Sequence, residues 1–190
     1  MIKSVDYWIR EFNNKNIAIV GNASSILDKA DGEIIDRMDY VIRMNRGFPR
    51  RARSQGRRTD ILAISCKIKR WQHRFFYKSP PIIWMTPKRD GIPSWVKRRG
   101  DYCFYPEKYC NDLSEALRNA GPSTGCMTVD LVCNYATPKK VNLFGFDFKE
   151  THTLGHSKLK MGPHDWSDEK RFVLNLLRKS DSLGFEMEIW

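Results

Sequence analysis

The stretch IAIVGNASS at residues 17–25 decides the fold class, because a fully apolar run stops at a glycine and a row of small residues. A second apolar run ends in VNLFGFD at residues 141–147, and it follows PSTG at residues 122–125. Buried strands that stop at glycine and asparagine leave free backbone N–H groups at their carboxyl ends, where open α/β sheets bind anionic ligands. The two stretches therefore predict an α/β sheet with a nucleotide-sugar site at its strand ends.

Strand and helix candidates alternate along the chain, which is typical of a mostly parallel central sheet flanked by helices. Short apolar runs predict strands at residues 17–20, 40–43, 60–64, 82–85, 102–105, 141–144 and 185–189, the last an edge strand. Helices are expected at residues 5–12, 31–36, 113–119, 127–135 and 168–179, with Ser167 as N-cap of the last. Residues 47–56 and 149–163 lack apolar periodicity, so we expect the least order there.

Length and composition fit one compact domain over residues 1–190, since 190 residues with 41% hydrophobic content can bury a core. No apolar run reaches the ~18 residues that span a bilayer, and the N-terminus lacks the layout of a signal peptide. We therefore expect a cytoplasmic protein. The five cysteines form an odd set without CxxC spacing, which favours reduced core thiols over a zinc site or disulfides.

Three histidines, His152, His156 and His164, fall within thirteen residues of one another in a polar segment. The ordinary pKa of histidine suits it to take a proton from a sugar hydroxyl near neutral pH. His152 and His156 have the i, i+4 spacing of a metal site, but Gly155 interrupts a stretch that we expect to be a loop. The cluster predicts acid–base chemistry and no metal site.

The net charge of +11 arises from 33 basic and 22 acidic residues. Residues 40–59 hold seven arginines and no acidic residue, and residues 67–78 mix five basic residues with four aromatic ones. Such a pattern can neutralise phosphates and stack bases, so a basic nucleic-acid-binding protein is an alternative, although no nucleic-acid motif is present. It equally fits a solvated face over core aromatics, or a potential that attracts anionic sugars and an anionic membrane surface.

Each candidate site motif also has an ordinary structural interpretation. Gly21-Asn22 is common in strand-to-helix turns, and Asn45 fits a plain turn. Ser123 or Thr124 can cap the helix that follows, and the same helix N-terminus can also bind a phosphate. The residues alone leave these alternatives open.

The motifs taken in order resemble the large, small and very small motifs of animal-type sialyltransferases. The strings are Gly21-Asn22, Arg43-Met44-Asn45, Ser123-Thr124-Gly125 and His164 with Glu169 five residues later. GFDF at residues 145–148 is similar to bacterial sialyltransferases. The resemblance covers residues 16 to about 180 and implies a Rossmann-like single domain, a GT-A-like variant. The animal family joins its large and small motifs by a disulfide, but the first strand here has no cysteine, which suits a reducing compartment. The animal enzymes also carry a membrane anchor and stem that are not seen in this sequence, so the resemblance implies a bacterial or viral catalytic domain.

The resemblance implies an inverting, metal-independent glycosyltransferase without cofactor. It would transfer sialic acid, or a related sugar such as Kdo, from a CMP-sugar donor to a hydroxyl of a glycan or glycolipid acceptor. A degenerate member that binds nucleotide without transfer is a further alternative. Peripheral contact with an anionic surface on the inner membrane face is expected, and nucleic acid is not an expected partner.

Individual roles follow from the same resemblance. His164 would be the general base, Glu169 would support the local structure, and His152 or His156 would face the departing phosphate. A lid at residues 149–163 would close over the substrates. Gly145 and Phe146 would line the cytosine pocket. The full set of residues expected to bind the CMP-sugar is Gly21, Asn22, Ser24, Asn45, Ser123, Thr124, Gly125, Gly145 and Phe146.

Overall fold

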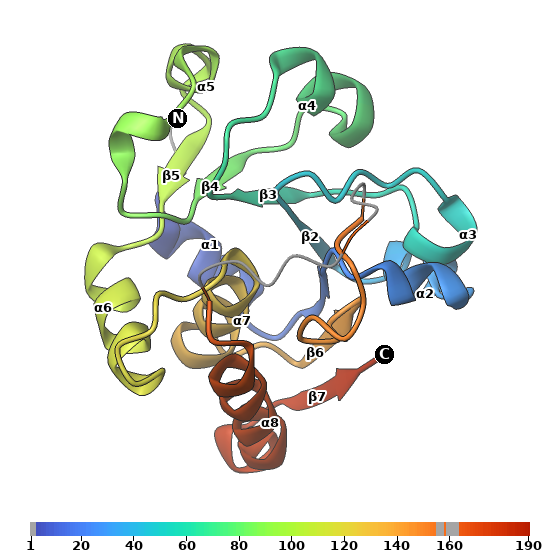
Figure 1. Ribbon diagram of the computed structural model, residues 1–190, viewed down its shortest axis with the longest axis vertical. Coiled ribbons are helices and arrows are strands. Elements are labelled where there is room, and N and C mark those ends of the chain that lie inside the picture. The colour runs from blue at the N-terminus through green and yellow to red at the C-terminus, as the bar shows by residue number, and fades with distance from the viewer. Residues whose placement is uncertain (1–2, 155–157, 159–163) are drawn as a thin grey trace.

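The computed structural model describes residues 3–154, 158 and 164–190, and its centre is one seven-stranded sheet (Figure 1). The strand order is β5-β4-β3-β2-β1-β6-β7, and every neighbouring pair is parallel. The predicted α/β class is therefore confirmed. The strands are β1 (Asn16–Val20), β2 (Tyr40–Met44), β3 (Ile61–Ile64), β4 (Ile82–Trp84), β5 (Tyr102–Phe104), β6 (Lys140–Phe144) and β7 (Glu186–Ile189).

The central strands are buried on both faces, which explains why their sequences are continuously apolar instead of alternating. In β1, Ile17 and Ile19 pack into the cluster on one face, whereas Ala18 and Val20 pack into a cluster on the other. Helices must therefore cover both faces.

The first face is covered by α1 (Val5–Phe12), α6 (Glu107–Ala116), α7 (Thr124–Tyr135) and α8 (Trp166–Leu183). The second face is covered by α2 (Gly32–Asp36), α3 (Ala52–Gln55), α4 (Arg70–Tyr77) and α5 (Ser94–Arg99), with two short 3-10 helices, η1 (Ser24–Asp28) and η2 (Arg89–Gly91). In Figure 1, α4 and α5 lie at one end of the molecule and α8 with β7 at the other. The result is a three-layer α/β arrangement.

The strand order reverses at β1, which pairs with β2 on one side and with β6 on the other. Open α/β sheets bind ligands in the crevice outside the carboxyl ends of the strands at such a switch point. The fold thus brings together the ends of the two stretches that the sequence singled out.

Several element boundaries differ from the sequence prediction. The predicted helix at residues 113–119 begins earlier, at Glu107, and the last helix is capped by Asp165, not by Ser167. The carboxylate of Asp165 accepts hydrogen bonds from the N–H groups of Ser167 and Asp168, which leaves Ser167 inside the first turn. The short helices α3, α4 and α5 were not predicted.

All five cysteines are free, and four of them are buried: Cys103, Cys110, Cys126 and Cys133. The thiols thus occupy the core, as the odd count and spacing suggest. In the part of the chain that the structure describes, no helix is both long and apolar enough to cross a membrane.

Candidate active site

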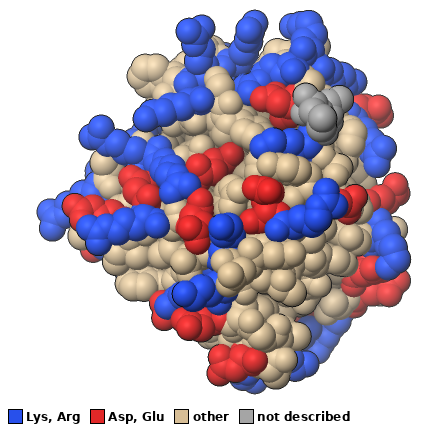
Figure 2. Space-filling model, turned by 180° about the vertical axis from the view of Figure 1, so that it is seen from behind, with Lys and Arg blue, Asp and Glu red and all other residues tan. Residues whose placement is uncertain are grey.

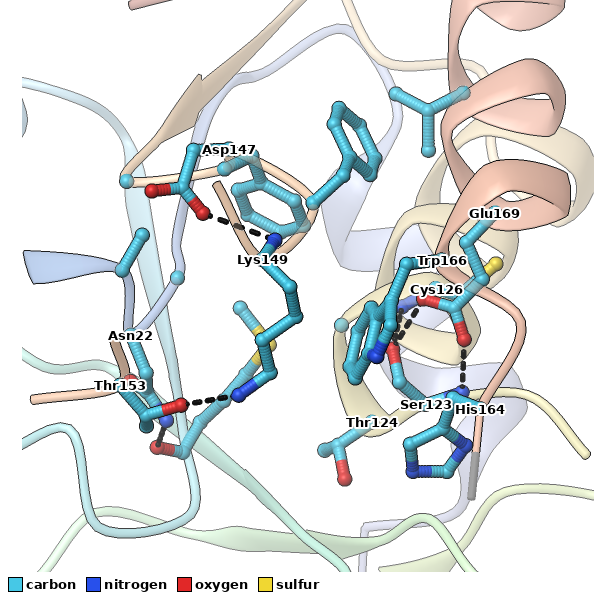
Figure 3. Close-up of a pocket in the computed structure, with 18 of the residues that line it drawn as sticks. Asn22, Ser123, Thr124, Cys126, Asp147, Lys149, Thr153, His164, Trp166 and Glu169 are labelled. Atoms are coloured by element: carbon cyan, nitrogen blue, oxygen red, sulfur yellow. Dashed lines mark hydrogen bonds between the residues drawn. The ribbon is translucent and has the colours of Figure 1, made fainter. Parts of the chain in front are cut away.

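A cavity of about 330 Å³ opens where β1, β2 and β6 end and α7 and α8 begin (Figure 3). Ser24 and His152 do not line it, and His156 lies outside the described residues. In Figure 3, Asn22, Asp147 and Thr153 flank one side, opposite the residues of α7 and α8. Ten residues predicted from the sequence line it: Gly21, Asn22, Asn45, Ser123, Thr124, Gly125, Gly145, Phe146, His164 and Glu169.

The ends of β1 and β6 approach each other so closely that the site needs glycine at Gly21. A Cβ there would lie 2.3 Å from the carbonyl oxygen of Gly145, a backbone atom that cannot rotate away. Gly145 itself adopts a φ of +65°, which favours glycine. Close backbone packing at the switch point therefore requires glycine at residue 21, in addition to any role of Gly21 in the turn.

The two asparagines fasten the loops that follow β1 and β2. The amide nitrogen of Asn22 donates to the carbonyl oxygen of Met44 at 3.1 Å, while its Oδ1 is buried and has no hydrogen-bond partner among the described residues. Asn45 has a φ of +48°, donates to Thr124 Oγ1 at 3.0 Å and accepts from Ser65 N–H at 2.8 Å. Leaving such a buried acceptor without a partner is costly.

Ser123 caps α7, and its own loop is held by Glu169. Ser123 Oγ accepts from Cys126 N–H at 3.2 Å, and the N–H and hydroxyl of Ser123 each donate to Glu169 at 2.6 Å. The N–H groups of Thr124 and Gly125 have no partner in the described part of the chain. Capping and anion binding therefore coexist here, because the cap uses Ser123 and leaves the next two donors at the positive end of the helix.

Glu169 is a buried carboxyl on the first turn of α8. Burial raises its pKa, and the two hydrogen bonds from Ser123 act in the opposite direction. Its two oxygens link the start of α8 to the start of α7, so Glu169 shapes the cavity wall.

The imidazole of His164 is oriented by the backbone. Its Nδ1 lies 2.7 Å from the carbonyl oxygen of Gly121, and the ring packs edge to face against Trp166 at 5.3 Å. A carbonyl only accepts, so Nδ1 carries the proton and Nε2 of the neutral ring holds the lone pair. This is the tautomer that a general base requires.

Sequence reasoning missed Lys149, the single lysine or arginine that lines the cavity among the described residues. Asp147 accepts from the N–H groups of Lys149 at 3.1 Å and Thr151 at 3.0 Å, which closes a tight loop. Within it Phe148 and Lys149 take φ values of +51° and +71°. Lys149 Nζ donates to Thr153 Oγ1 at 2.5 Å and lies 5.2 Å from the centre of the Trp166 ring.

Two neighbouring positive φ values outside glycine are strained, and such strain is held in place only by surrounding contacts. The hydroxyl of Ser25 provides one such contact, since it donates to the carboxylate of Asp147 at 3.1 Å. The signal for this turn was present in the sequence, since GFDF was singled out, but no role was given to its aspartate.

The first residues of the expected lid are fastened to the loop after β1. Thr153 forms an antiparallel bridge with Ala23, Ser24 N–H donates to the carbonyl of His152 at 2.9 Å, and Leu154 N–H donates to that of Asn22 at 2.7 Å. The Nδ1 of His152 lies 3.2 Å from Ser24 Oγ. This pairing places His152 and Ser24 beside the cavity. Most of the remaining lid, residues 155–163, lies outside the described residues.

Within the described ranges, no three His, Cys, Asp or Glu side chains form a group that could hold a metal ion. Lys149 and the two free N–H groups of α7 instead surround the cavity with donors. That donor set matches a phosphate group.

Comparison with known proteins agrees with this architecture. Residues 7–79 match the model of glycosyltransferase family 29, the sialyltransferases. Among curated proteins, no sequence is similar enough to count as a relative. The family match covers β1 to β3 and so includes Gly21, Asn22 and Asn45.

Solved sialyltransferases share the fold over most of the chain. A mammalian sialyltransferase in complex with Gal-β-1,3-GalNAc-ortho-nitrophenol superimposes with a TM-score of 0.68 and 19% identity, over 93% of this chain and 69% of that one. The Campylobacter jejuni enzyme CstII, in complex with the substrate analogue CMP-3FNeuAc, gives a TM-score of 0.57 and 14% identity over 93% and 79%. The chain therefore has the sialyltransferase fold, and the resemblance drawn from its motifs is confirmed.

Proposed function

We propose that this chain is an inverting glycosyltransferase that transfers a sugar from a CMP-sugar donor to a hydroxyl of a glycan acceptor. The main support for the proposal is that one cavity is lined by His164, whose ring is oriented by a hydrogen bond, by Lys149 and by the free N–H groups of α7. A base and an anion site in one cavity are what displacement of a nucleoside phosphate needs. The family match at residues 7–79 supports the same class of reaction.

In the proposed reaction His164 Nε2 takes the proton of the acceptor hydroxyl while that oxygen attacks the anomeric carbon of the donor. The bond between this carbon and the phosphate oxygen breaks, and its electron pair leaves with CMP. Attack opposite the leaving group inverts the anomeric centre. A positioned general base contributes about 10² to 10⁴-fold to such a step.

The charge that develops on the departing phosphate would be met by the Lys149 ammonium and by the N–H groups of Thr124 and Gly125. The expectation that His152 or His156 faces the phosphate stays a prediction, since His152 lies beside the cavity without lining it and His156 lies outside the described residues. Preorganised donors aimed at a developing anion need no reorganisation during the reaction. Transfer without a metal ion remains a prediction, tested by activity in EDTA.

The donor sugar is proposed as sialic acid, with Kdo as the alternative, because structures that share the fold are complexes with CMP or a CMP-sialic acid analogue. Gal-β-1,3-GalNAc, present in the mammalian complex, is the first acceptor to try. We also propose that the protein acts in the cytoplasm at the inner face of a membrane.

The decisive experiment combines transfer and binding in two histidine variants. His164→Ala should lower transfer from CMP-sialic acid or CMP-Kdo about 10³-fold and leave the calorimetric affinity for CMP within about twofold. His152→Ala is the matched control, since its ring lies outside the cavity lining. If His164→Ala transfers as fast as the parent protein, or if only His152→Ala fails, His164 is not the base. NMR of the product reports the anomeric configuration.

A further inference from the structure

Positive charge is segregated in this chain. Residues 40–100 contain seventeen basic and two acidic residues, a net charge of +15, whereas the rest of the chain sums to −4. This segment forms β2 to β4 and α3 to α5, so the charge belongs to one end of the sheet. Figure 2 shows Lys and Arg gathered at the upper end of the molecule, where α4 and α5 lie in Figure 1, and mixed with Asp and Glu elsewhere.

Helix α4 presents two parallel ridges to solvent. Arg70 and Arg74 lie four residues apart on one ridge of the helix, Lys78 follows as its left-handed C-cap, and all three are exposed. Trp71 and Phe75 form the adjacent ridge and expose 58% and 75% of their surface. None of the three cations has an ion-pair partner in the described part of the chain, so their charge is free to meet a ligand.

The exposed rings continue an aromatic cluster instead of standing alone. Phe76 packs edge to face on Phe75 at 5.0 Å, lies 6.2 Å from Trp71 and stacks on Phe48 at 4.4 Å. The buried face of α4 is anchored by Tyr77, whose hydroxyl donates to the carbonyl oxygen of Asn45 at 3.0 Å. The rings are therefore held outward from a rigid base beside the candidate active site.

We propose that the solvent face of α4 together with its C-cap, formed by Arg70, Trp71, Arg74, Phe75 and Lys78, docks on an anionic lipid bilayer. Tryptophan and phenylalanine partition into the interface between headgroups and acyl chains, while neighbouring cations contact anionic headgroups. Each Lys or Arg near such a surface contributes about 1 kcal/mol. This inference concerns a second surface and stands independently of the proposed transfer.

Other occupants fit the same face less well. A second copy would bring two +15 segments together, which repel each other. Single-stranded nucleic acid binds in grooves whose aromatic side chains stack on its bases. Trp71 and Phe75 project from the ridge of a helix, a convex shape suited to insertion.

The test is co-sedimentation with vesicles of phosphatidylcholine, with and without phosphatidylglycerol, beside a fluorescent single-stranded oligonucleotide. Arg70→Gln/Arg74→Gln/Lys78→Gln should weaken binding to the anionic vesicles about 100-fold. Each lost charge is expected to lower the affinity by somewhat less than tenfold. Trp71→Ser/Phe75→Ser should weaken it about tenfold. Circular dichroism checks that both variants fold.

The matched control removes three exposed cations from the other part of the chain, Lys15→Gln/Lys139→Gln/Lys179→Gln. It lowers the net charge equally and should change vesicle binding by less than about threefold, since those charges lie beyond the docking face. Leu183→Ser, at another exposed apolar residue, controls for the aromatic variant. Equal losses in control and test variants, no preference for anionic vesicles, or tighter oligonucleotide binding through the same residues would overturn the proposal.

Discussion

Two regions of the molecule use charged residues in opposite ways. Around β1, β6 and α8 a single lysine, Lys149, lines the cavity, and a strained loop directs it there. The segment from β2 to α5 carries a net +15, yet none of its lysines or arginines lines that cavity among the described residues. The difference teaches that the overall charge of the chain says little about the charge in its site.

A second contrast lies within the basic segment. Arg43 is fully buried and donates to the carbonyls of Gln55 and Arg58, and Arg58 itself pairs with Asp60. Arg70 and Arg74 are exposed and have no such partners in the described residues. Arginines that look alike in the sequence therefore divide into those that hold loops and those that are free to bind.

We expect the largest change when the buried Arg43 is replaced. Arg43→Met should lower the free energy of unfolding by about 3 kcal/mol, because the buried carbonyl of Gln55 and the partly buried carbonyl of Arg58 lose their charged donor. Arg57→Met, at an exposed arginine of the same stretch, should cost at most about 0.5 kcal/mol. Urea unfolding measures both. Equal stability of Arg43→Met and the parent protein would show that the buried guanidinium merely offsets its own desolvation.

The next effect concerns the lone cavity lysine. Lys149→Ala should lower the rate of transfer about 100-fold, the usual loss when one donor to a developing anion is removed. Lys149→Arg should restore part of it. Lys170→Ala is the matched control, because Lys170 pairs with Glu150 near the same loop but does not line the cavity. A normal turnover rate in Lys149→Ala would remove Lys149 from the mechanism.

A smaller effect is expected at the junction of α7 and α8. Glu169→Gln retains the size of the side chain but can accept only one of the two hydrogen bonds from Ser123, so CMP affinity should fall about tenfold. Asp168→Asn removes the same charge one residue earlier, where the buried carboxylate pairs with Arg171 and Arg118 and does not line the cavity, and should leave CMP affinity unchanged. Calorimetry decides, and equal affinities for both variants would exclude the proposed role of Glu169 in shaping the site.

The smallest effect is a pH dependence in the basic segment. Burial and the nearby Arg99 lower the pKa of His73 to about 4. Its Nε2 donates to the carbonyl of Pro80 at 2.9 Å, and its Nδ1 accepts from Arg99 at 2.8 Å, which fits a neutral ring. Between pH 6.5 and 4 the unfolded chain binds the extra proton, so stability should fall as pH falls through this window.

The loss between pH 7 and 5.5 should be about 1 kcal/mol. The difference between the unfolding free energies of the parent protein and His73→Gln isolates this part, because other titrating groups cancel. A difference that does not change with pH would contradict the buried neutral histidine.

Much of the sheet was predictable because each strand is a short apolar run that the fold buries on both faces. All seven strand candidates exist, and the site loops follow the strands that the sequence singled out. The helices α3 and α5 were missed because four and six residues show little periodicity, and α4 was missed because it exposes two aromatic residues that the pattern suggests are in the core.

Lys149 could not be predicted from residue type, since nothing local distinguishes it from other lysines. Its direction depends on the Asp147 turn and on the pairing of Thr153 with Ala23, a contact between segments far apart in the chain. The position of His152 was equally unpredictable, because only the fold shows that it pairs with Ser24 beside the cavity. The spacing of residues in the sequence identifies candidate site residues, whereas contacts between distant segments determine which of them line the cavity.

The most direct measurement is calorimetric titration of the protein with CMP in EDTA, with UMP and AMP as controls. We expect saturable binding of CMP at one site, weak or absent binding of UMP and AMP, and a clear loss of affinity in Lys149→Ala, since Lys149 lines the cavity. Equal binding of the three nucleotides, or no CMP binding by a folded protein, would contradict the proposal that this cavity serves a CMP-sugar.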